Sequence, residues 1–319
     1  DDRSNKDELF PGLVACDAEC FTMFSEIFDP VIKQIHSGWR RRKHFFNANP
    51  QKLTNTSIDP HYIVEARIEV RRNLSGMRLA PCCDRAERRR AEDIIARSLL
   101  ALGGGRLSGT YMPLSWSESY AEKPAMRLEE QAQLRDEGLL FLEPSDPTRL
   151  SMGLGRDWPD ARGIFLSLFR EFFVWVNEED HLCLTVKGDA LDQVYRNALE
   201  AIELLEQEII KQGSSFLKDD CLGFLTVSPF KLGNGLTCVV SLRLPNLGKH
   251  AKFGELCKKL HLAPTWQSGA WKLTNLPSLG VPEVDLANAV IEAGAMLVDL
   301  EKKLTRGSSI EAELKSLIT

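Results

Sequence analysis

The sequence predicts an α+β fold, in which helices flank a largely antiparallel β-sheet and a small helical part precedes it. Residues 62–71 alternate apolar and charged side chains, as a strand with one buried face does. Residues 172–176 and 182–186 are apolar segments separated by an acidic turn, a pattern typical of a β-hairpin. Residues 190–211 and 284–304 carry apolar residues at helical spacing and predict two long amphipathic helices.

The first predicted helix lies at about residues 18–35, where apolar side chains recur every three or four positions. Pro30 is expected to bend or break it. Residues 37–60 begin with a basic run and continue with Asn, Pro, Thr and Ser, so they predict a linker. We therefore expect one domain boundary near residue 60, with residues 1–60 as a helical part plus linker and residues 61–319 as the main domain.

Further elements are predicted along the main domain. A helix rich in Arg and Glu is expected at residues 84–101, and three consecutive glycines at 103–105 end it. Residues 223–227 and 236–244 predict two strands joined through a KLGNG segment, and residues 250–261 predict another helix. Strands joined as hairpins with helices between groups of strands favour the antiparallel arrangement over a doubly wound one.

Length and charge exclude several classes of protein. The chain has 319 residues, 43% hydrophobic and 27% charged, which is enough for one large domain and part of a second. With 40 Lys and Arg against 45 Asp and Glu, the net charge of -5 provides no overall basic field for nucleic acid. No apolar run approaches the roughly 18 residues of a membrane-spanning helix. We expect a soluble protein that binds neither nucleic acid nor membrane.

The eight cysteines predict reduced thiols, because no secretory apolar segment stands at the amino end. Cys16 and Cys20 lie four apart, but no second pair has zinc-ribbon spacing, and the adjacent Cys82 and Cys83 are poorly placed to chelate one ion. We therefore expect no metal site and a cytoplasmic location.

Six segments resemble one family, the phosphagen (guanidino) kinases, with the creatine kinases as the nearest members. The similarity covers essentially the whole chain. The segments are SEIFDPV at 25–31, GMRLAP at 76–81, DRAERR at 84–89, RDWPDARGI at 156–164, FVWVNEEDHL at 173–182 and LPNLGKH at 244–250.

The resemblance implies a fold and a reaction. Residues 1–60 would be the remnant of a helical N-terminal domain plus linker, and residues 61–319 a phosphagen kinase-like catalytic-fold domain. The chain starts late relative to the family pattern, so it is either naturally short or one unit of a longer polypeptide. Family members transfer the γ-phosphoryl of ATP to a guanidinium nitrogen, while Mg²⁺ and arginines hold the phosphate charge. The family's guanidinium-binding acid corresponds to Glu179, with Glu178 beside it.

The sequence departs from the family pattern at most of the phosphate-binding arginines. Arg67 is retained as a relic ATP phosphate contact, but Glu69, Cys183 and Thr237 stand at three matched positions, and the contracted loop 263–270 lacks the fifth arginine. At an effective dielectric of about 20, unit charges about 4 Å apart interact by roughly 4 kcal/mol, so replacing a cation by Glu69 is severe for phosphate binding. An alternative interpretation is structural, since charges of alternating sign along residues 65–71 can neutralise one another.

Ser228 replaces the family's reactive cysteine and cannot supply a thiolate near neutral pH. Gly138 and Ser241 replace two family histidines. Without the resemblance, Glu178 and Glu179 would be interpreted as part of a solvated hairpin tip. The turns and glycines of the framework are kept, whereas the losses fall on phosphate and guanidinium contacts.

We therefore expect a creatine-kinase-like pseudoenzyme that acts as a structural or binding module, needs no cofactor and has a protein partner. A dimer, or a place in a cytoskeletal or flagellar assembly, fits that expectation. The alternatives are an active ATP:guanidino phosphotransferase that uses Mg-ATP and a nucleotide sensor without transfer. Residues 37–46, which combine four cations with Trp39, Phe45 and Phe46, form the predicted docking segment, unless these aromatics pack back on the main domain.

Overall fold

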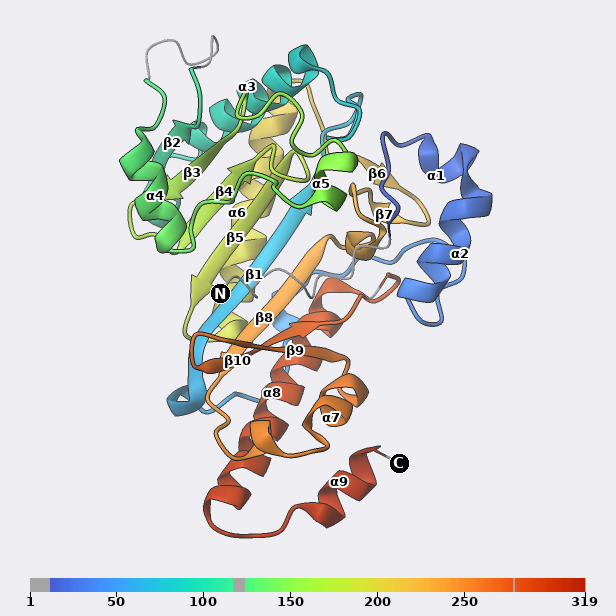
Figure 1. Ribbon diagram of the computed structural model, residues 1–319, viewed down its shortest axis with the longest axis vertical. Helices are drawn as coiled ribbons and strands as arrows, with labels where there is room; N and C mark the ends of the chain where they lie inside the picture. Colours follow the sequence, from blue (N-terminus) through green and yellow to red (C-terminus); the bar gives the residue numbers. More distant parts are fainter. Residues whose placement is uncertain (1–11, 117–123, 278, 319) are drawn as a thin grey trace.

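A computed structural model describes residues 12–116, 124–277 and 279–318, and it confirms the predicted α+β fold (Figure 1). Eight strands form one sheet in the order β2-β3-β4-β5-β1-β8-β10-β9, and every neighbouring pair is antiparallel. The strands are β1 (Ile63–Arg72), β2 (Gly109–Pro113), β3 (Gly163–Ser167), β4 (Phe172–Val176), β5 (Leu182–Gly188), β8 (Leu236–Leu242), β9 (Leu262–Gln267) and β10 (Ala270–Asn275).

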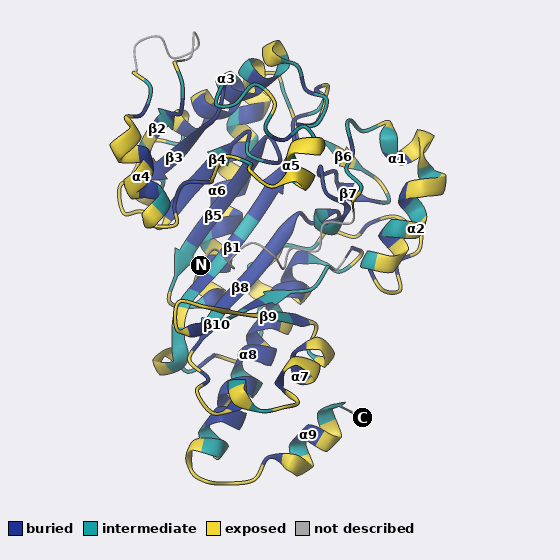
Figure 2. Cartoon of the chain, viewed as in Figure 1, coloured by how far each residue is buried: buried dark blue, intermediate teal, exposed yellow. Residues whose placement is uncertain are grey.

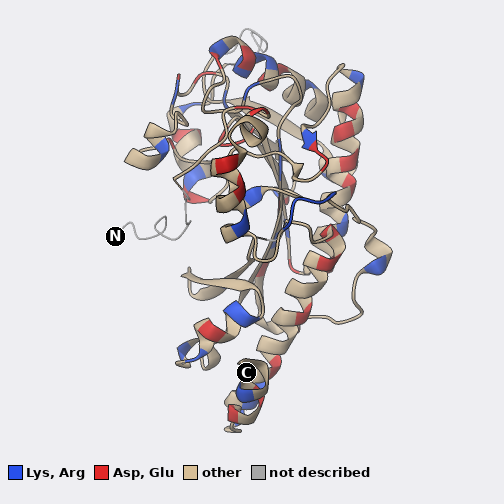
Figure 3. Ribbon diagram, turned by 90° about the vertical axis from the view of Figure 1, so that its right-hand side faces the viewer, with Lys and Arg blue, Asp and Glu red and all other residues tan. Residues whose placement is uncertain are grey.

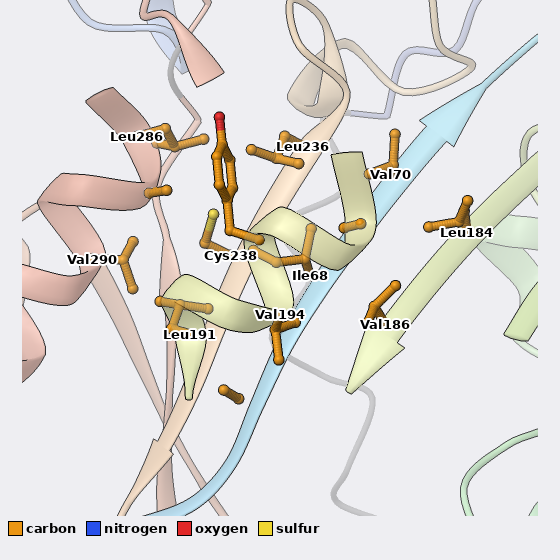
Figure 4. Close-up of a cluster of buried hydrophobic side chains, with 14 of the residues drawn as sticks. Ile68, Val70, Leu184, Val186, Leu191, Val194, Leu236, Cys238, Leu286 and Val290 are labelled. Carbon is orange, nitrogen blue, oxygen red and sulfur yellow. The ribbon is translucent and has the colours of Figure 1, made fainter. Parts of the chain in front are cut away.

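Three helices cover one face of this sheet, namely α3 (Arg85–Ala101), α6 (Leu191–Lys211) and α8 (Glu283–Thr305). Asp84 caps α3 through a capping box with Glu87, which fixes where that helix begins. Alternate strand residues point toward these helices, and Ile68 of β1 is completely buried. Figure 4 shows Ile68, Val186 and Val194 within one cluster of buried apolar side chains. In Figure 2 most of the sheet is buried, whereas β9 is mostly intermediate or exposed.

On the opposite face of the sheet, the described residues form an apolar covering layer over the β2–β4 part. There α4 (Leu128–Asp136) and the segment that follows it bury Leu134 and Phe141 against Ile164, Leu166 and Phe173. α5 (Pro147–Ser151) follows in the same connection. On the central strands β5, β1 and β8, the residues facing away from the helices are instead mostly polar, and this surface carries the candidate site.

The helical N-terminal part differs from the single helix predicted at 18–35. The chain forms α1 (Cys20–Met23) and α2 (Ser25–Ile35), interrupted at Phe24, where ψ turns to 31°. Pro30 lies inside α2, so the expected break there is wrong. Phe28 and Ile32 of α2 pack in a second apolar cluster with Leu225 and Leu232.

The linker 37–60 lies against the main domain through two of its three aromatic residues. Trp39 is 7% exposed and joins the cluster around α2, and the Phe46 ring packs edge-on against Phe224 at 5.3 Å. Phe45 is 65% exposed. The packing alternative therefore holds for Trp39, whereas Phe45 projects freely and Phe46, at 40% exposed, is only partly covered. The linker also contains the short 3-10 helix η1 (Pro50–Lys52), and η2 (Pro60–Tyr62) leads into β1.

Of the two strands predicted at 223–227 and 236–244, the second is confirmed as β8, whereas the first is only two residues long and lies outside the main sheet. β7 (Gly223–Phe224) pairs with β6 (Lys218–Asp219) in a separate two-stranded sheet, while β8 lies in the main sheet. The reason is that Gly233 folds back: its amide donates to Leu222 O at 2.8 Å and its carbonyl accepts from Phe224 N at 2.7 Å. Gly233 adopts φ 98°, which a residue with a side chain would rarely tolerate.

The C-terminal part adds α7 (Phe253–Lys259) and α9 (Glu311–Ile318), of which only the first was predicted. The side of the molecule drawn in Figure 3 carries both signs of charge along its helices, in keeping with the small net charge. None of the helices in the described ranges has a stretch long and apolar enough to cross a bilayer.

Candidate functional site

The polar face of β1 is the centre of the candidate site. Glu65, Arg67, Glu69 and Arg71 alternate with the buried residues of the strand and therefore point away from the covering helices. β1 lies between β5 and β8, so their polar positions stand beside these charges: Arg71 is the register partner of Cys183, and Glu69 pairs with both Thr185 and Thr237.

Arg67 is held between two carboxylates of its own strand. Its Nη2 lies 2.8 Å from Glu65 Oε1, and its Nη1 lies 3.5 Å from Glu69 Oε1. Burial lowers the pKa of Arg67, but Glu69 and Glu65 outweigh this effect and raise it above the ordinary value. Lys187 Nζ adds a contact of 3.6 Å to Glu65 Oε2. The alternating charges thus neutralise one another, as the structural interpretation of the sequence predicted.

Arg71 turns toward the acidic residues that connect β4 and β5. Its Nη1 lies 3.2 Å from Glu178 Oε2 and 3.7 Å from Asp180 Oδ2, and only 9% of its side chain is exposed. Burial opposes the charged form, but Cys183, Glu178, Glu179 and Asp180 raise the pKa of Arg71 well above its usual range. Arg71 is therefore a buried, permanently charged guanidinium among carboxylates.

The acidic turn is buried, which contradicts its interpretation as a solvated hairpin tip. Glu179 is 5% exposed and Asp180 is 1% exposed. Asp180 Oδ1 accepts hydrogen bonds from Asn73 Nδ2 at 2.6 Å and from Val227 N at 2.9 Å, so the turn is tied to the end of β1 and to the segment before Ser228. The structure therefore brings Glu178, Glu179 and Ser228, all predicted from sequence, to one end of β1.

Ser228 begins a short 3-10 helix, η5 (Pro229–Lys231), as its N-cap residue. Its Oγ accepts a hydrogen bond from Phe230 N at 3.4 Å, and its carbonyl accepts one from Thr226 Oγ1 at 2.9 Å. The hydroxyl is thus engaged with the backbone. An alcohol in this position caps a turn and carries no charge.

Cations from other positions stand beside two of the sites where the family resemblance predicts a lost arginine. Arg71 adjoins Cys183, whose pKa burial raises to about 12, so that Cys183 stays an uncharged thiol. Lys231 Nζ lies 3.4 Å from Thr237 Oγ1. Sequence reasoning gave neither cation a place in the site. For Arg71 the signal was available, because it shares the strand face of Arg67.

The predicted contracted loop 263–270 is a tight β-hairpin. β9 and β10 pair from Leu262 to Asn275, and only Ser268 and Gly269 form the turn, both with positive φ. Trp266 and Trp271 pack edge-to-face at 5.3 Å across the hairpin. The segment predicted to be a contracted loop is thus mostly the paired strands β9 and β10.

Within residues 12–116, 124–277 and 279–318, no three His, Cys, Asp or Glu side chains converge as metal ligands. The eight cysteines are thiols, and four of them, including Cys183, are buried.

Comparison with known proteins places these features in context. The family model described as ATP:guanido phosphotransferase, C-terminal catalytic domain, matches residues 92–304, and the model for the N-terminal domain of that family matches residues 2–33. Creatine kinase M-type of Torpedo marmorata is 35% identical over 312 residues, covering 94% of this chain and 79% of that protein. The testis isozyme of creatine kinase from Oncorhynchus mykiss is 36% identical over the same coverage.

Solved structures agree with the sequence comparison. A crystal structure of lombricine kinase superimposes with a TM-score of 0.87 at 30% identity, covering 96% of this chain and 84% of that one. The duplicated taurocyamine kinase from Schistosoma mansoni, with bound transition state analog components, gives a TM-score of 0.82 at 28% identity, covering 92% of this chain and 41% of that one.

Proposed function

Because this chain belongs to the ATP:guanido phosphotransferase family, we propose that it is a phosphagen kinase homologue that has lost phosphoryl transfer and acts as a binding or structural module. The observation that carries the proposal is the pairing of Arg67 with Glu65 and Glu69 at 2.8 Å and 3.5 Å. Phosphoryl transfer depends on cations that are free to hold the charge of the phosphates. In this site the retained cation is already neutralised by two carboxylates.

The loss of catalytic rate expected from missing arginines supports the same proposal. Removing a single transition-state arginine costs about 10³ to 10⁵ in rate, and a typical kinase turns over about 1 to 100 times per second. Glu69, Cys183 and Thr237 occupy three positions that correspond to phosphate-binding arginines. These losses are not additive, but one full effect is enough to bring the rate near background.

The residues on this face do not fit the triphosphate of Mg-ATP. Glu69 lies in the middle of the polar face, and although burial raises its pKa, Arg67 and Arg71 outweigh this and lower it, so that Glu69 is ionised. An anionic triphosphate placed here would face a carboxylate between two cations that are already paired. We therefore derive no step through a bound nucleotide.

A second candidate function is that of an active ATP:guanido phosphotransferase with rearranged cations. It is favoured by the similarity to creatine kinases and by Lys231, whose Nζ stands 3.4 Å from Thr237 Oγ1 and returns a cation to one vacated position. Glu178 and Glu179, the relic guanidinium-binding acids, are also retained and buried or nearly so. Under this function the cofactor is Mg-ATP.

Calorimetric titration of Mg-ATP at low salt, with a coupled assay on creatine, arginine and related guanidino acceptors, separates the two functions. We expect no binding in the micromolar range and no turnover above background. Glu69→Arg is the informative variant, because it restores a cation at a matched position, and we expect it to strengthen ATP binding by about tenfold or more. Wild-type turnover that disappears in Glu179→Gln would establish the second function instead.

The partner of the proposed module is a protein in the cytoplasm, and a cytoskeletal or flagellar assembly remains our prediction for its setting. Phe45 supports such a contact, because it is exposed next to the cations of residues 40–43. Phe45→Ala should weaken association and leave the thermal stability unchanged. If Phe45→Ala lowers the thermal stability as well as association, Phe45 serves packing alone.

A further inference from the structure

Arg71 is bound inside the chain in the way a small guanidinium ligand is bound by a protein. One guanidinium nitrogen, Nη1, contacts two carboxylates, Glu178 Oε2 at 3.2 Å and Asp180 Oδ2 at 3.7 Å. The side chain is 9% exposed. A planar guanidinium with several N–H donors is suited to carboxylates that converge on it from different directions.

The acidic pocket around this guanidinium is built by the fold and is more than a surface cluster. Asp180 is fixed by hydrogen bonds from Asn73 Nδ2 and Val227 N to its Oδ1, while its Oδ2 is buried, has no hydrogen bond and faces Arg71. Burial raises the pKa of Asp180 above its ordinary value, and the charge of Arg71 opposes this shift. A buried carboxylate oxygen that accepts no hydrogen bond needs a nearby cation to compensate its charge, and Arg71 provides that cation here.

The charge of Arg71 is already paired with these carboxylates, whereas a phosphate-binding arginine must be free to pair with a phosphate. Its neighbour Glu178 receives a second cation, since Arg149 Nη1 lies 4.0 Å from Glu178 Oε1. Arg67 is occupied by Glu65 and Glu69 further along the same strand. The local arrangement therefore presents a filled cation site to any ligand that approaches β1.

We infer that Arg71 of this chain fills the acidic pocket formed by Glu178 and Asp180, so that a free guanidine compound binds there only when that side chain is withdrawn or removed. The inference rests on the proposed function in one respect, since a permanently filled site is one reason for the lack of transfer. The ligand class is a monosubstituted guanidine or the guanidinium ion itself.

The test is to replace the lost side chain with a free ion. Arg71→Ala removes the guanidinium and leaves the carboxylates, and guanidinium chloride is added at about 20 mM, where its denaturing effect is negligible. We expect Arg71→Ala to unfold at lower temperature than the wild type and to regain part of the difference as guanidinium is added. The wild type should show no gain, because its site is filled.

Two controls make the result specific. Urea at the same concentration has a similar shape without the charge, and sodium chloride matches the ionic strength; neither should stabilise Arg71→Ala. In the double variant Arg71→Ala/Glu178→Gln, guanidinium should bind about tenfold more weakly or not at all, since one charged partner is gone. If guanidinium stabilises wild type and variant equally, or if Glu178→Gln changes nothing, the inference is overturned.

A measurement on the wild type covers the case in which Arg71→Ala does not fold. The Nη protons of Arg71 should give slowly exchanging, restricted resonances in the NMR spectrum, and Glu178→Gln should release them. Rapidly averaging resonances in the wild type would contradict the inference.

The guanidinium and NMR experiments use no nucleotide, so their results are independent of the Mg-ATP titration and turnover assay that test the proposed function. Wild-type turnover with a guanidino acceptor refutes the proposed function without reference to Arg71→Ala. An Arg71→Ala variant that gains no stability from guanidinium would overturn the inference and leave the proposed function unaffected.

Discussion

The two faces of the central strand β1 are built by different physical interactions. On the helix-covered face, Ala66, Ile68 and Val70 are at most 1% exposed and pack against α6. On the other face, Arg67 and Arg71 are surrounded by carboxylates that neutralise them. The first face is stabilised by apolar burial, and the second by the pairing of opposite charges. The fold of the family is thus supported by the apolar face, whereas the polar face carries the candidate site.

The first prediction tests whether packing alone holds β1. Ile68→Ala should reduce the free energy of unfolding by about 2 to 5 kcal/mol, because it leaves a cavity in a completely buried position. Its neighbour on the opposite face provides the matched control: Glu69→Gln should cost less than about 1 kcal/mol, since Arg67 keeps Glu65 as a partner. Urea denaturation of both variants measures the difference. Equal losses would mean that the charged face also carries the fold.

The second prediction concerns two buried histidines that lie outside the main core. Burial lowers the pKa of His36 and of His181 to about 4 in each case. Each accepts a backbone N–H at Nδ1, from Leu279 and Leu74 respectively, so each is neutral in the folded chain. Their contribution to stability is complete above about pH 6.5 and is lost as the pH falls toward 4, because the unfolded chain takes up protons that the folded chain does not.

At pH 5 we expect a loss of about 2 kcal/mol for each of these histidines relative to pH 7. Thermal unfolding measured across that range gives the dependence. His36→Gln and His181→Gln should each lower the stability at pH 7 but flatten its dependence on pH. If stability still falls with pH in both variants as it does in the wild type, other groups cause the acid sensitivity.

The third and smallest expected effect is in the β9–β10 hairpin, where backbone geometry alone is tested. Gly269 has φ 81°, so Gly269→Ala should cost about 1 to 2 kcal/mol. Gly254 of α7 has no atom within 4 Å of an added methyl group and no positive φ. Gly254→Ala should therefore stabilise the chain by up to about 1 kcal/mol. Calorimetry of the pair would contradict this interpretation if both changes had the same sign.

The long helices and the central strands could be predicted from sequence because their signals are local. The alternation in β1 and the Arg- and Glu-rich composition of α3 depend on neighbouring residues alone, and both predicted elements are confirmed. The pairing of residues 223–227 could not be predicted in this way, since Gly233 binds back to Leu222 and Phe224 through contacts that no periodicity encodes.

The candidate site was predictable in part for the same reason. Glu178, Glu179 and Ser228 were identified through motifs, and the structure places them at one end of β1. The partner of Glu178 was not predicted, because Arg71 and Glu178 are 107 positions apart and meet only through the pairing of β1 with β5. Sign alternation along a strand indicates that charges can pair, but it does not tell which distant residue each one meets.

The central position of β1 also has a consequence for the timing of synthesis. β1 is complete at Arg72, yet one of its two neighbours, β8, ends at Leu242, about 170 residues later. At roughly 5 to 20 residues per second, the ribosome needs about ten to thirty seconds to add them. During that interval β1 has no native partner along that edge, and strands in this state are prone to join other chains. Charged side chains discourage such pairing, so the charges on the polar face of β1 protect the unfinished chain during those seconds.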